Sequence, residues 1–408
     1  MPRRITIFFL SLVLLVTIVY LADRNLSYSK GKDPYEYAMQ GVSIWKSEGI
    51  RFHGNWDVVL PPGFPLVIGL VATVLGNPEW SAKVVSIIAF IISLSLVYRI
   101  SAFYFSQQRN VNLVMLLYAT NSNILVNASS GYSESLFVAV FMLLVWIRLN
   151  GLKNNRIELW RTAVFSVLWA WLYYIRPEGL ILGGILFAWL LADHYSTAKY
   201  MLGVPFICFI LIFPYLFFLK QTTGHWQWSG KTYLNLVMGE LNSPYQQGSL
   251  SVTANDRYTI IDKTQADPSL SKGFLEYWNE KENDITGRIP VNMVKLFKVY
   301  GYSFSPLGLL IILMGTYGMR RRDISFLLSM LTPLTILLLF FILGRTVAVY
   351  HWIMIIFMAN GIIMIEQFIS NKWNQKYARV MVYAMTAGII LYQMRSVVKM
   401  IYFFSMEH

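Results

Sequence analysis

Long apolar runs recur along almost the whole chain, and they constrain its fold more than any other feature. A helix that crosses a bilayer needs about 17–25 mostly apolar residues. The segments that approach or meet this length are residues 5–22, 84–105, 111–129, 134–149, 162–176, 179–192, 200–219, 302–318, 324–343, 346–367 and 380–396. The pattern predicts an all-α polytopic membrane protein, with a bundle of about eleven transmembrane helices.

The composition excludes the other main classes of protein. Of the 408 residues, 56% are hydrophobic and only 13% are charged, which is too little polar surface to cover a soluble domain. The many Trp, Tyr and Phe residues argue against intrinsic disorder. The single cysteine, Cys208, excludes a disulfide framework, a cysteine-based zinc site and thiol-pair chemistry.

The positive charges are distributed as the positive-inside rule requires. The chain has 34 Lys or Arg and 21 Asp or Glu, a net charge of +13. With a cytoplasmic N-terminus, 15 of the basic and 4 of the acidic residues lie inside, whereas 19 and 17 lie outside. The excess charge is therefore a topology signal, and we expect no nucleic-acid partner.

The first apolar run follows Arg3 and Arg4, a pattern shared by signal peptides and first membrane spans. No clear small-residue cleavage site follows in residues 20–23. We therefore favour an uncleaved first span.

This topology divides the chain into three parts. Residues 1–219 are predicted to form an N-terminal transmembrane module, whose first external loop is 23–83. Within that loop residues 65–75 are apolar but short, which is typical of a helix at the outer interface. Residues 220–300 are predicted to form an external loop or small subdomain with a few short helices. Residues 301–408 supply the C-terminal transmembrane helices.

Acidic residues gather at the outer edge of the membrane, next to predicted helix starts. Carboxylates beside hydrocarbon are unfavourable, so their presence suggests a function. Asp33, Asp57, Glu134 and Glu178 are the four candidates. Two of them also have a structural interpretation, which stays open. Asp33 before a proline suits a helix N-cap, and Glu134 in a first turn suits the helix dipole.

Two arginines lie at the same membrane edge. Arg176 belongs to Arg-Pro-Glu-Gly, a sequence that interrupts an apolar run. Arg345 lies alone between two apolar runs. Each either extends toward the headgroups or binds an anion. The histidines, including His351, lack the spacing of metal ligands, and motifs for nucleotide binding or for zinc hydrolases are absent from the sequence.

Five short motifs follow one another in a recognisable order. They are Asp33-x-x-x-Tyr37-Ala38, Pro61-Pro62-Gly63-Phe64-Pro65, Trp80-Ser81-Ala82-Lys83-Val84, Tyr132-Ser133-Glu134-Ser135-Leu136-Phe137 and Arg176-Pro177-Glu178-Gly179-Leu180. Together they resemble the membrane glycosyltransferases of the GT-C superfamily, in the branch of the protein O-mannosyltransferases and aminoarabinose transferases. The resemblance covers about residues 1–190 and is weaker over residues 344–361.

The resemblance implies a sugar donor carried on a polyprenyl phosphate and used at the outer face. It also implies a catalytic base in the first external loop, a role that falls on Asp33. Glu134 matches a second acid of the family, and Arg345 matches a phosphate-binding arginine, with His351 a weaker match. One departure is Leu60, where the aminoarabinose branch has a basic residue. Aminoarabinose and lipid A are thus doubtful substrates.

These residue types suit transfer of a sugar from a lipid phosphate. A carboxylate accepts the proton of the acceptor hydroxyl, and arginines stabilise the charge that develops on the phosphate. Asp33 as base predicts inversion at the sugar carbon. Arg176 and Arg51 are alternative phosphate ligands. Tyr37, Asp57 and Glu178 are expected to support the site or the acceptor. Glu134 orients the acceptor, holds a divalent cation or supports the site, so a metal stays possible.

We therefore expect an inverting glycosyltransferase in a prokaryotic plasma membrane, with its site facing outside and a glycan, lipid or protein acceptor. The alternative is a transporter or flippase of a lipid-linked or small polar solute. Transporters place charges near the membrane midplane, in paired repeats. Here the acids lie at the outer edge and the sequence has no visible repeat, which favours the enzyme. A third possibility, a non-catalytic assembly subunit, is less compatible with the presence of Asp33.

Overall fold

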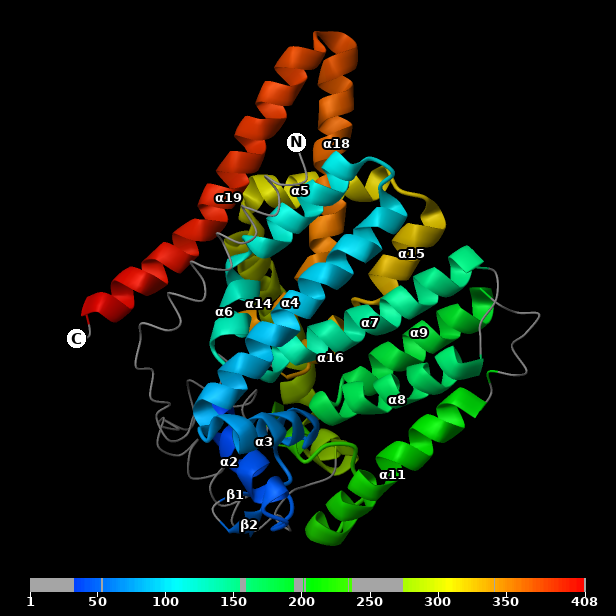
Figure 1. Ribbon diagram of the computed structural model, residues 1–408, viewed down its shortest axis with the longest axis vertical. Helices are drawn as coiled ribbons and strands as arrows, with labels where there is room; N and C mark the ends of the chain where they lie inside the picture. Colours follow the sequence, from blue (N-terminus) through cyan, green and yellow to red (C-terminus); the bar gives the residue numbers. More distant parts are fainter. Residues whose placement is uncertain are drawn as a thin grey trace.

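The computed structural model describes residues 33–52, 54–154, 159–193, 201, 203–233, 235–236, 274–340 and 342–406. The first predicted span, 5–22, and the middle of the predicted outer loop lie outside these residues. Within them the chain is almost entirely helical, and one antiparallel pair of two-residue strands is the only sheet (Figure 1). The prediction of an all-α polytopic membrane protein is confirmed.

The helices, in chain order, are α2 (Asp33–Trp45), α3 (Gly63–Leu75), α4 (Pro78–Tyr104), α5 (Gln108–Ala119), α6 (Ser122–Ser129), α7 (Ser133–Asn154), α8 (Leu159–Ile175), α9 (Gly179–Asp193), α11 (Gly203–Thr223), α14 (Phe274–Tyr317), α15 (Arg321–Ser329), α16 (Thr332–Leu337), α17 (Gly344–Ala348), α18 (His351–Lys372) and α19 (Gln375–Met406). The strands are β1 (Arg51–Phe52) and β2 (Asn55–Trp56). The β hairpin and α2 lie at one end of the molecule, and the turn between α18 and α19 lies at the other (Figure 1).

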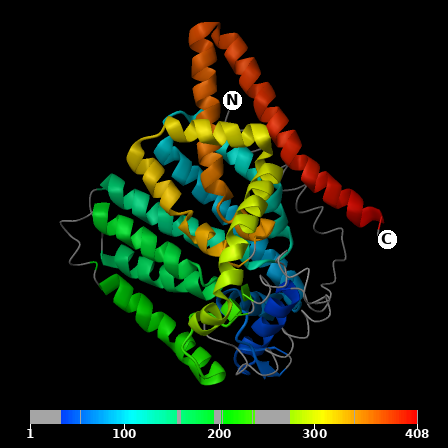
Figure 2. The ribbon, with the colours of Figure 1, turned by 180° about the vertical axis from the view of Figure 1, so that it is seen from behind.

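Five helices of the described chain are long and apolar enough to cross a membrane. They are α4, most of α7 (Ser133–Gly151), α11, most of α14 (Trp278–Tyr317) and α18. The shorter apolar helices α3 and α9 accompany them. The protein is thus an integral membrane protein. Seen from behind, α14 and α18 run side by side, and they pack extensively (Figure 2).

Two predicted spans are interrupted in the structure. Residues 111–129 form α5 and α6, because the Asn121 side chain accepts the Ile124 N–H at 3.3 Å and starts a new helix. Residues 324–343 contain α15 and α16, and Pro333 starts the second of these. Residues 302–318 are the C-terminal part of α14, which begins at Phe274, inside the predicted outer loop.

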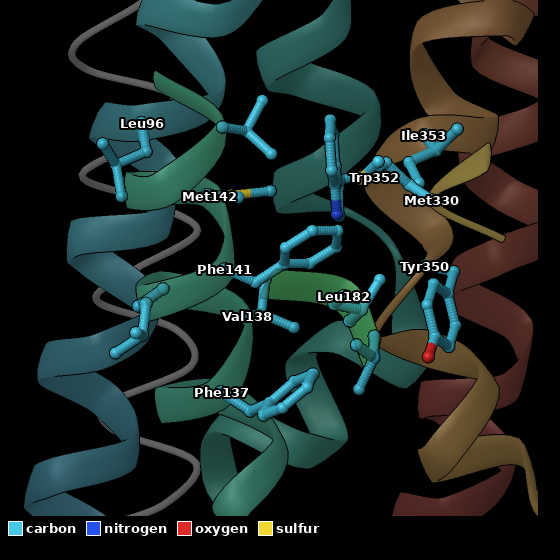
Figure 3. Packing of buried hydrophobic residues seen from close by; sticks show 14 of the residues in the cluster. Leu96, Phe137, Val138, Phe141, Met142, Leu182, Met330, Tyr350, Trp352 and Ile353 are labelled. Atoms are coloured by element: carbon cyan, nitrogen blue, oxygen red, sulfur yellow. The ribbon is translucent and has the colours of Figure 1, made fainter. Parts of the chain in front are cut away.

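An aromatic contact within the buried core joins α7 to α18. Phe141 of α7 meets Trp352 of α18 edge to face, with ring centroids 5.5 Å apart (Figure 3). Both side chains are completely buried. Edge-to-face pairs add about 0.5–1.5 kcal/mol to the burial of their area. The C-terminal helices also pack on the N-terminal part of the chain where α18 meets α5 and α17 meets α6, and these contacts bring distant sequence segments together.

Residues 33–75 of the predicted first external loop fold as a unit of α2, the β hairpin and α3. The predicted interface helix is α3, and it crosses α2 at two glycines. A Cβ atom at Gly41 would lie 2.6 Å from the Pro65 carbonyl oxygen, and one at Gly69 would lie 2.3 Å from the Gly41 oxygen. Only glycine permits so close an approach. The contact fixes the direction in which α2 presents its first residue, Asp33.

Asp57 holds the turn that connects the hairpin to α3. It is 3% exposed. Its Oδ1 accepts the N–H groups of Val59 at 2.8 Å and Leu60 at 3.3 Å, and its Oδ2 accepts the Gln40 side-chain amide at 3.0 Å. Burial raises the pKa of Asp57 to about 6, although these hydrogen bonds and Lys231 act in the opposite direction.

We expect Asp57→Asn to flatten the pH dependence of stability between pH 4 and 7. The raised pKa means that folding favours protonated Asp57, and this contribution is lost as pH rises through about 6. It amounts to roughly 3 kcal/mol in the native protein. Asparagine stays neutral and keeps one acceptor oxygen. Thermal unfolding of the purified protein at each pH measures the effect.

Glu48→Gln provides the matched control, because Glu48 is an exposed acid of the same loop. This control should follow the pH profile of the native protein. An Asp57→Asn profile that also follows it would contradict the assignment.

Candidate functional site

Six charged side chains of alternating sign form a continuous row at the end of the bundle where the first external loop packs. We call this set the charge row. In order it consists of Glu178, Arg176, Glu134, Arg345, Asp33 and Lys231. Four of these residues were predicted from the sequence to lie in the site beside Asp33, and the structure brings all of them together.

The buried half of the row is centred on Arg176. Its Nε lies 2.5 Å from Glu178 Oε1, and its Nη1 lies 2.8 Å from Glu134 Oε1. The sequence places these groups locally. Arg176 and Glu178 occupy the turn in which Gly179 begins α9, and Glu134 lies in the first turn of α7, where the helix dipole favours a carboxylate.

The open half of the row is centred on Asp33. Arg345 Nη2 lies 2.5 Å from Asp33 Oδ2, and Lys231 Nζ lies 3.8 Å from the same oxygen. Arg345 also reaches Glu134, with 3.7 Å between Nε and Oε1. The side chains of Asp33, Arg345 and Lys231 are 26–28% exposed, whereas that of Glu134 is 3% exposed. The Asp33 half is therefore the more exposed half of the row.

Arg345 is held in place by contacts from α6 and from the turn before α7. Its carbonyl oxygen accepts a hydrogen bond of 3.0 Å from Asn127 Nδ2. Its guanidinium lies 4.4 Å from the centre of the Tyr132 ring, a favourable cation–π distance. Arg345 is part of the short helix α17. The guanidinium is thus oriented before any ligand arrives.

The surrounding cations set the charge state of Asp33. Burial alone would raise the pKa of its carboxyl, but Lys231 and Arg345 outweigh burial and lower the pKa to about 2. Asp33 is therefore ionised at neutral pH. In the structure as it stands, it is a carboxylate neutralised by two cations, and a weak base for that reason.

Other residues predicted for the site differ in their placement. Tyr37 is brought in, since its hydroxyl lies 3.2 Å from the Ser133 Oγ, next to Glu134. Asp57 is near but bonds the backbone of its own loop and Gln40, as described above. Arg51 is outside the row, because it donates to the Gly54 carbonyl oxygen and covers the Trp56 ring.

His351 is also outside the row. It is completely buried, its Nδ1 lies 3.0 Å from Asn121 Oδ1, and it packs against the Phe304 ring at 4.8 Å. These contacts make it a core histidine that joins α18 to the start of α6. It does not face the carboxylates of the row.

Lys231 is the member of the row that the sequence did not indicate. It lies in the polar segment after α11 and belongs to none of the five motifs. The Ser-Gly before it suggests a turn, but nothing in its spacing relates it to Asp33. Only the packing of this segment on the first external loop shows its role.

The carboxylates of the row do not fit a bound divalent cation. Asp33 and Glu134 both contact Arg345, so a guanidinium already bridges the two carboxylates. No group of three or more His, Cys, Asp or Glu side chains in the described chain is arranged to hold a metal. The internal cations already neutralise the acids.

A family model supports the sequence resemblance. Residues 59–218 match the model described as dolichyl-phosphate-mannose-protein mannosyltransferase. This range includes Glu134, Arg176 and Glu178. No curated protein matches the chain in sequence.

Solved structures with the same fold are distant in sequence. The oligosaccharyltransferase of Archaeoglobus fulgidus, in a structure with zinc and sulfate, is 12% identical with a TM-score of 0.58. The alignment covers 94% of this chain and 52% of the oligosaccharyltransferase, so the chain spans about half the length of that protein.

Two structures of ArnT from Cupriavidus metallidurans are also similar. The apo form is 13% identical with a TM-score of 0.43, covering 88% of this chain and 80% of that one. The form bound to undecaprenyl phosphate is 14% identical with a TM-score of 0.45, covering 90% and 81%.

The fold and the matched family agree with the order of motifs in the sequence. The helical membrane bundle predicted from the sequence is confirmed. The chain is thus similar to this mannosyltransferase family over residues 59–218, and it shares the fold of the archaeal oligosaccharyltransferase.

Proposed function

We propose that the chain transfers a sugar from a polyprenyl-phosphate donor to an acceptor hydroxyl, with inversion at the sugar carbon. The observation that carries the proposal is the contact of Asp33 with Arg345 at the open half of the charge row. The contact sets a carboxylate, which we propose as the proton acceptor, next to a guanidinium, which we propose as a phosphate ligand. The description of the matched family names a sugar carried on a lipid phosphate, which supports this donor class.

The reaction is a single displacement at the anomeric carbon. The acceptor oxygen forms a bond to this carbon while the bond to the phosphate oxygen breaks. The acceptor proton passes to Asp33, and the electron pair leaves with the polyprenyl phosphate. Arg345 stabilises the charge that builds up on the phosphate, since a guanidinium matches phosphate geometry. Attack opposite the leaving group inverts the carbon.

Donor binding also has to free the Asp33 carboxylate from its ion pairs with Arg345 and Lys231. With Arg345 and Lys231 beside it, its pKa of about 2 makes it a poor base. A donor phosphate competes with the carboxylate for these cations. When they turn toward the phosphate, the pKa of Asp33 rises and its oxygen becomes available to the acceptor. Glu134 keeps Arg345 and Arg176 near the site, and Tyr37 and Glu178 support this arrangement.

We place the site on the outer face of a prokaryotic plasma membrane. The short loops rich in Lys and Arg support a cytoplasmic location for the opposite end of the bundle. At that end Arg109 pairs with Glu366, far from the charge row. Acceptors of the proposed reaction are hydroxyls of a glycan, a lipid or a protein.

Mass spectrometry of glycans and lipids from cells with and without the gene identifies the substrates. The lipid-linked sugar that accumulates and the product that disappears name the donor and the acceptor. An unchanged profile of lipid-linked sugars would contradict the proposed donor class.

Asp33→Asn should lower the transfer rate by about 10²–10⁴-fold, the usual contribution of a general base. The amide keeps the shape of the side chain but cannot accept the proton. The assay follows labelled sugar from the purified polyprenyl-phosphate donor to the acceptor. Glu48→Gln, which removes an exposed acid of the same loop, should leave the rate unchanged. A normal rate in folded Asp33→Asn protein would remove Asp33 from the mechanism.

Arg345→Ala should raise the KM for the donor by roughly 10- to 100-fold, because a hydrogen bond to a charged group contributes about 1.5–3 kcal/mol. The KM for the acceptor should change much less. Arg51→Ala is the matched control, since Arg51 lies in the same outer region but outside the charge row. Equal effects of the two substitutions would count against a phosphate-binding role for Arg345.

Chelation by EDTA should leave the transfer rate unchanged. Arg345 lies between Asp33 and Glu134, so the acids are neutralised without a metal. The purified enzyme is assayed before and after dialysis against EDTA, and again with added Mg²⁺ or Mn²⁺. Loss of activity that either ion restores would show that a metal displaces Arg345.

A further inference from the structure

The charge row ends at Lys231, the last residue of a short segment, Trp228–Lys231, to which the proposed function gives no role. Tyr173 of α8 donates a hydrogen bond of 2.7 Å to the Trp228 carbonyl oxygen. The Lys231 N–H donates to the Ser229 Oγ at 3.1 Å, and Ser229 is 2% exposed. The segment is therefore a fixed turn.

Gly230 lets this turn pack closely against the loop that contains Val58. A Cβ atom at position 230 would lie 2.1 Å from the Val58 carbonyl oxygen, so only glycine fits there. Val58 stands two residues before Leu60. The contact brings Lys231 to within 3.8 Å of Asp33. Lys231 thus brings a basic group from the segment after α11 to Asp33. It comes close to the loop in which Leu60 precedes Pro61 and Pro62.

The order of charges makes Lys231 the least neutralised member of the row. Arg176 contacts two carboxylates, and Arg345 also contacts two. Among the described residues Lys231 forms one ion pair, at 3.8 Å, with a carboxylate that Arg345 contacts at 2.5 Å. An anion placed at this open end would continue the alternation of charge.

The charge and exposure of Lys231 suit such an anion. Burial lowers the pKa of its ammonium, but Asp33 outweighs this effect and leaves the pKa above the ordinary value, so Lys231 is charged at neutral pH. Its side chain is 27% exposed. A lysine ammonium is a point charge on a flexible stem, which can turn from a carboxylate to a phosphate without moving the backbone.

We propose that Lys231 is a phosphate ligand of the donor site and shares the donor phosphate with Arg345. This inference rests on the proposed function, since it assigns a further ligand to the same site. The binding of a lipid phosphate tests it without requiring transfer.

The experiment measures the Kd of the purified full-length protein for undecaprenyl monophosphate in detergent, by titration calorimetry. Lys231→Met and Lys231→Gln should each weaken binding by roughly 10- to 100-fold, the range for a lost charge-assisted hydrogen bond. Lys231→Arg should keep most of the affinity. Lys220→Met is the matched control, because Lys220 is exposed and covers the Trp226 ring outside the row.

Two further ligands separate the charge effect from other causes. The neutral polyprenol should bind the Lys231 variants and the native protein equally. Inorganic phosphate alone should bind at least about tenfold more weakly than the lipid, because it lacks the apolar chain. A folded Lys231→Met or Lys231→Gln protein with native affinity for the lipid phosphate overturns the inference. So does an equal loss of affinity for polyprenol, or equal binding of inorganic phosphate and lipid.

These outcomes are distinct from failure of the proposed function. If the Lys231 variants lose lipid phosphate but no lipid-linked sugar supports transfer, the ligand assignment stands and the transfer reaction fails. If transfer occurs but the variants bind lipid phosphate normally, the transfer reaction stands and the ligand assignment fails.

Discussion

The ion pair between Asp33 and Arg345 is the interaction on which the site depends. It joins the first residue of α2 to α17, across 312 positions of sequence. Charged groups beside an apolar bundle lose hydration, and they persist there only when each is compensated. The pair is possible because α18 packs on α5 and α17 packs on α6, where the Asn127 side chain donates a hydrogen bond to the Arg345 carbonyl oxygen.

The rest of the charge row follows from the same requirement. Glu134 is almost completely buried, so it needs the two arginines that contact it. From Glu134 toward Asp33 the exposure of the side chains increases, and the row ends in the single, longer ion pair of Lys231. The buried centre of the row is fully compensated, whereas the weaker compensation of Lys231 leaves a charge that a substrate is able to recruit. A mechanism that begins with displacement of cations from Asp33 is consistent with this gradient.

A second set of ion pairs lies at the opposite end of the bundle. Asp193 at the end of α9 contacts Arg148 of α7 at 2.7 Å, and it also contacts Arg322 of α15. The Arg148 guanidinium covers the Phe326 ring at 3.8 Å. These contacts connect the N-terminal module to the later helices where the short loops are basic. Both ends of the bundle therefore compensate a buried carboxylate with two arginines, Glu134 in the charge row and Asp193 at the opposite end.

The sequence by itself determined the class of fold and the local parts of the site. Run length and apolarity are local properties, so they predicted most of the spans. The motifs identified Asp33, Glu134, Arg176 and Glu178, because each lies at a helix start or turn with a readable pattern. The sequence patterns did not show that Asn121 divides one predicted span, because this division depends on a single side-chain hydrogen bond.

Only the tertiary structure decided which charges meet. Arg51 and Arg345 are alike in the sequence as single basic residues near the outer face, yet one covers Trp56 and the other reaches Asp33. Lys231 joined the site because Gly230 fits against Val58, a contact between segments with no shared pattern. An ion pair forms only between groups that lie within a few ångströms of each other, whereas a sequence pattern describes neighbours along the chain. The membership of the charge row was therefore decided by packing.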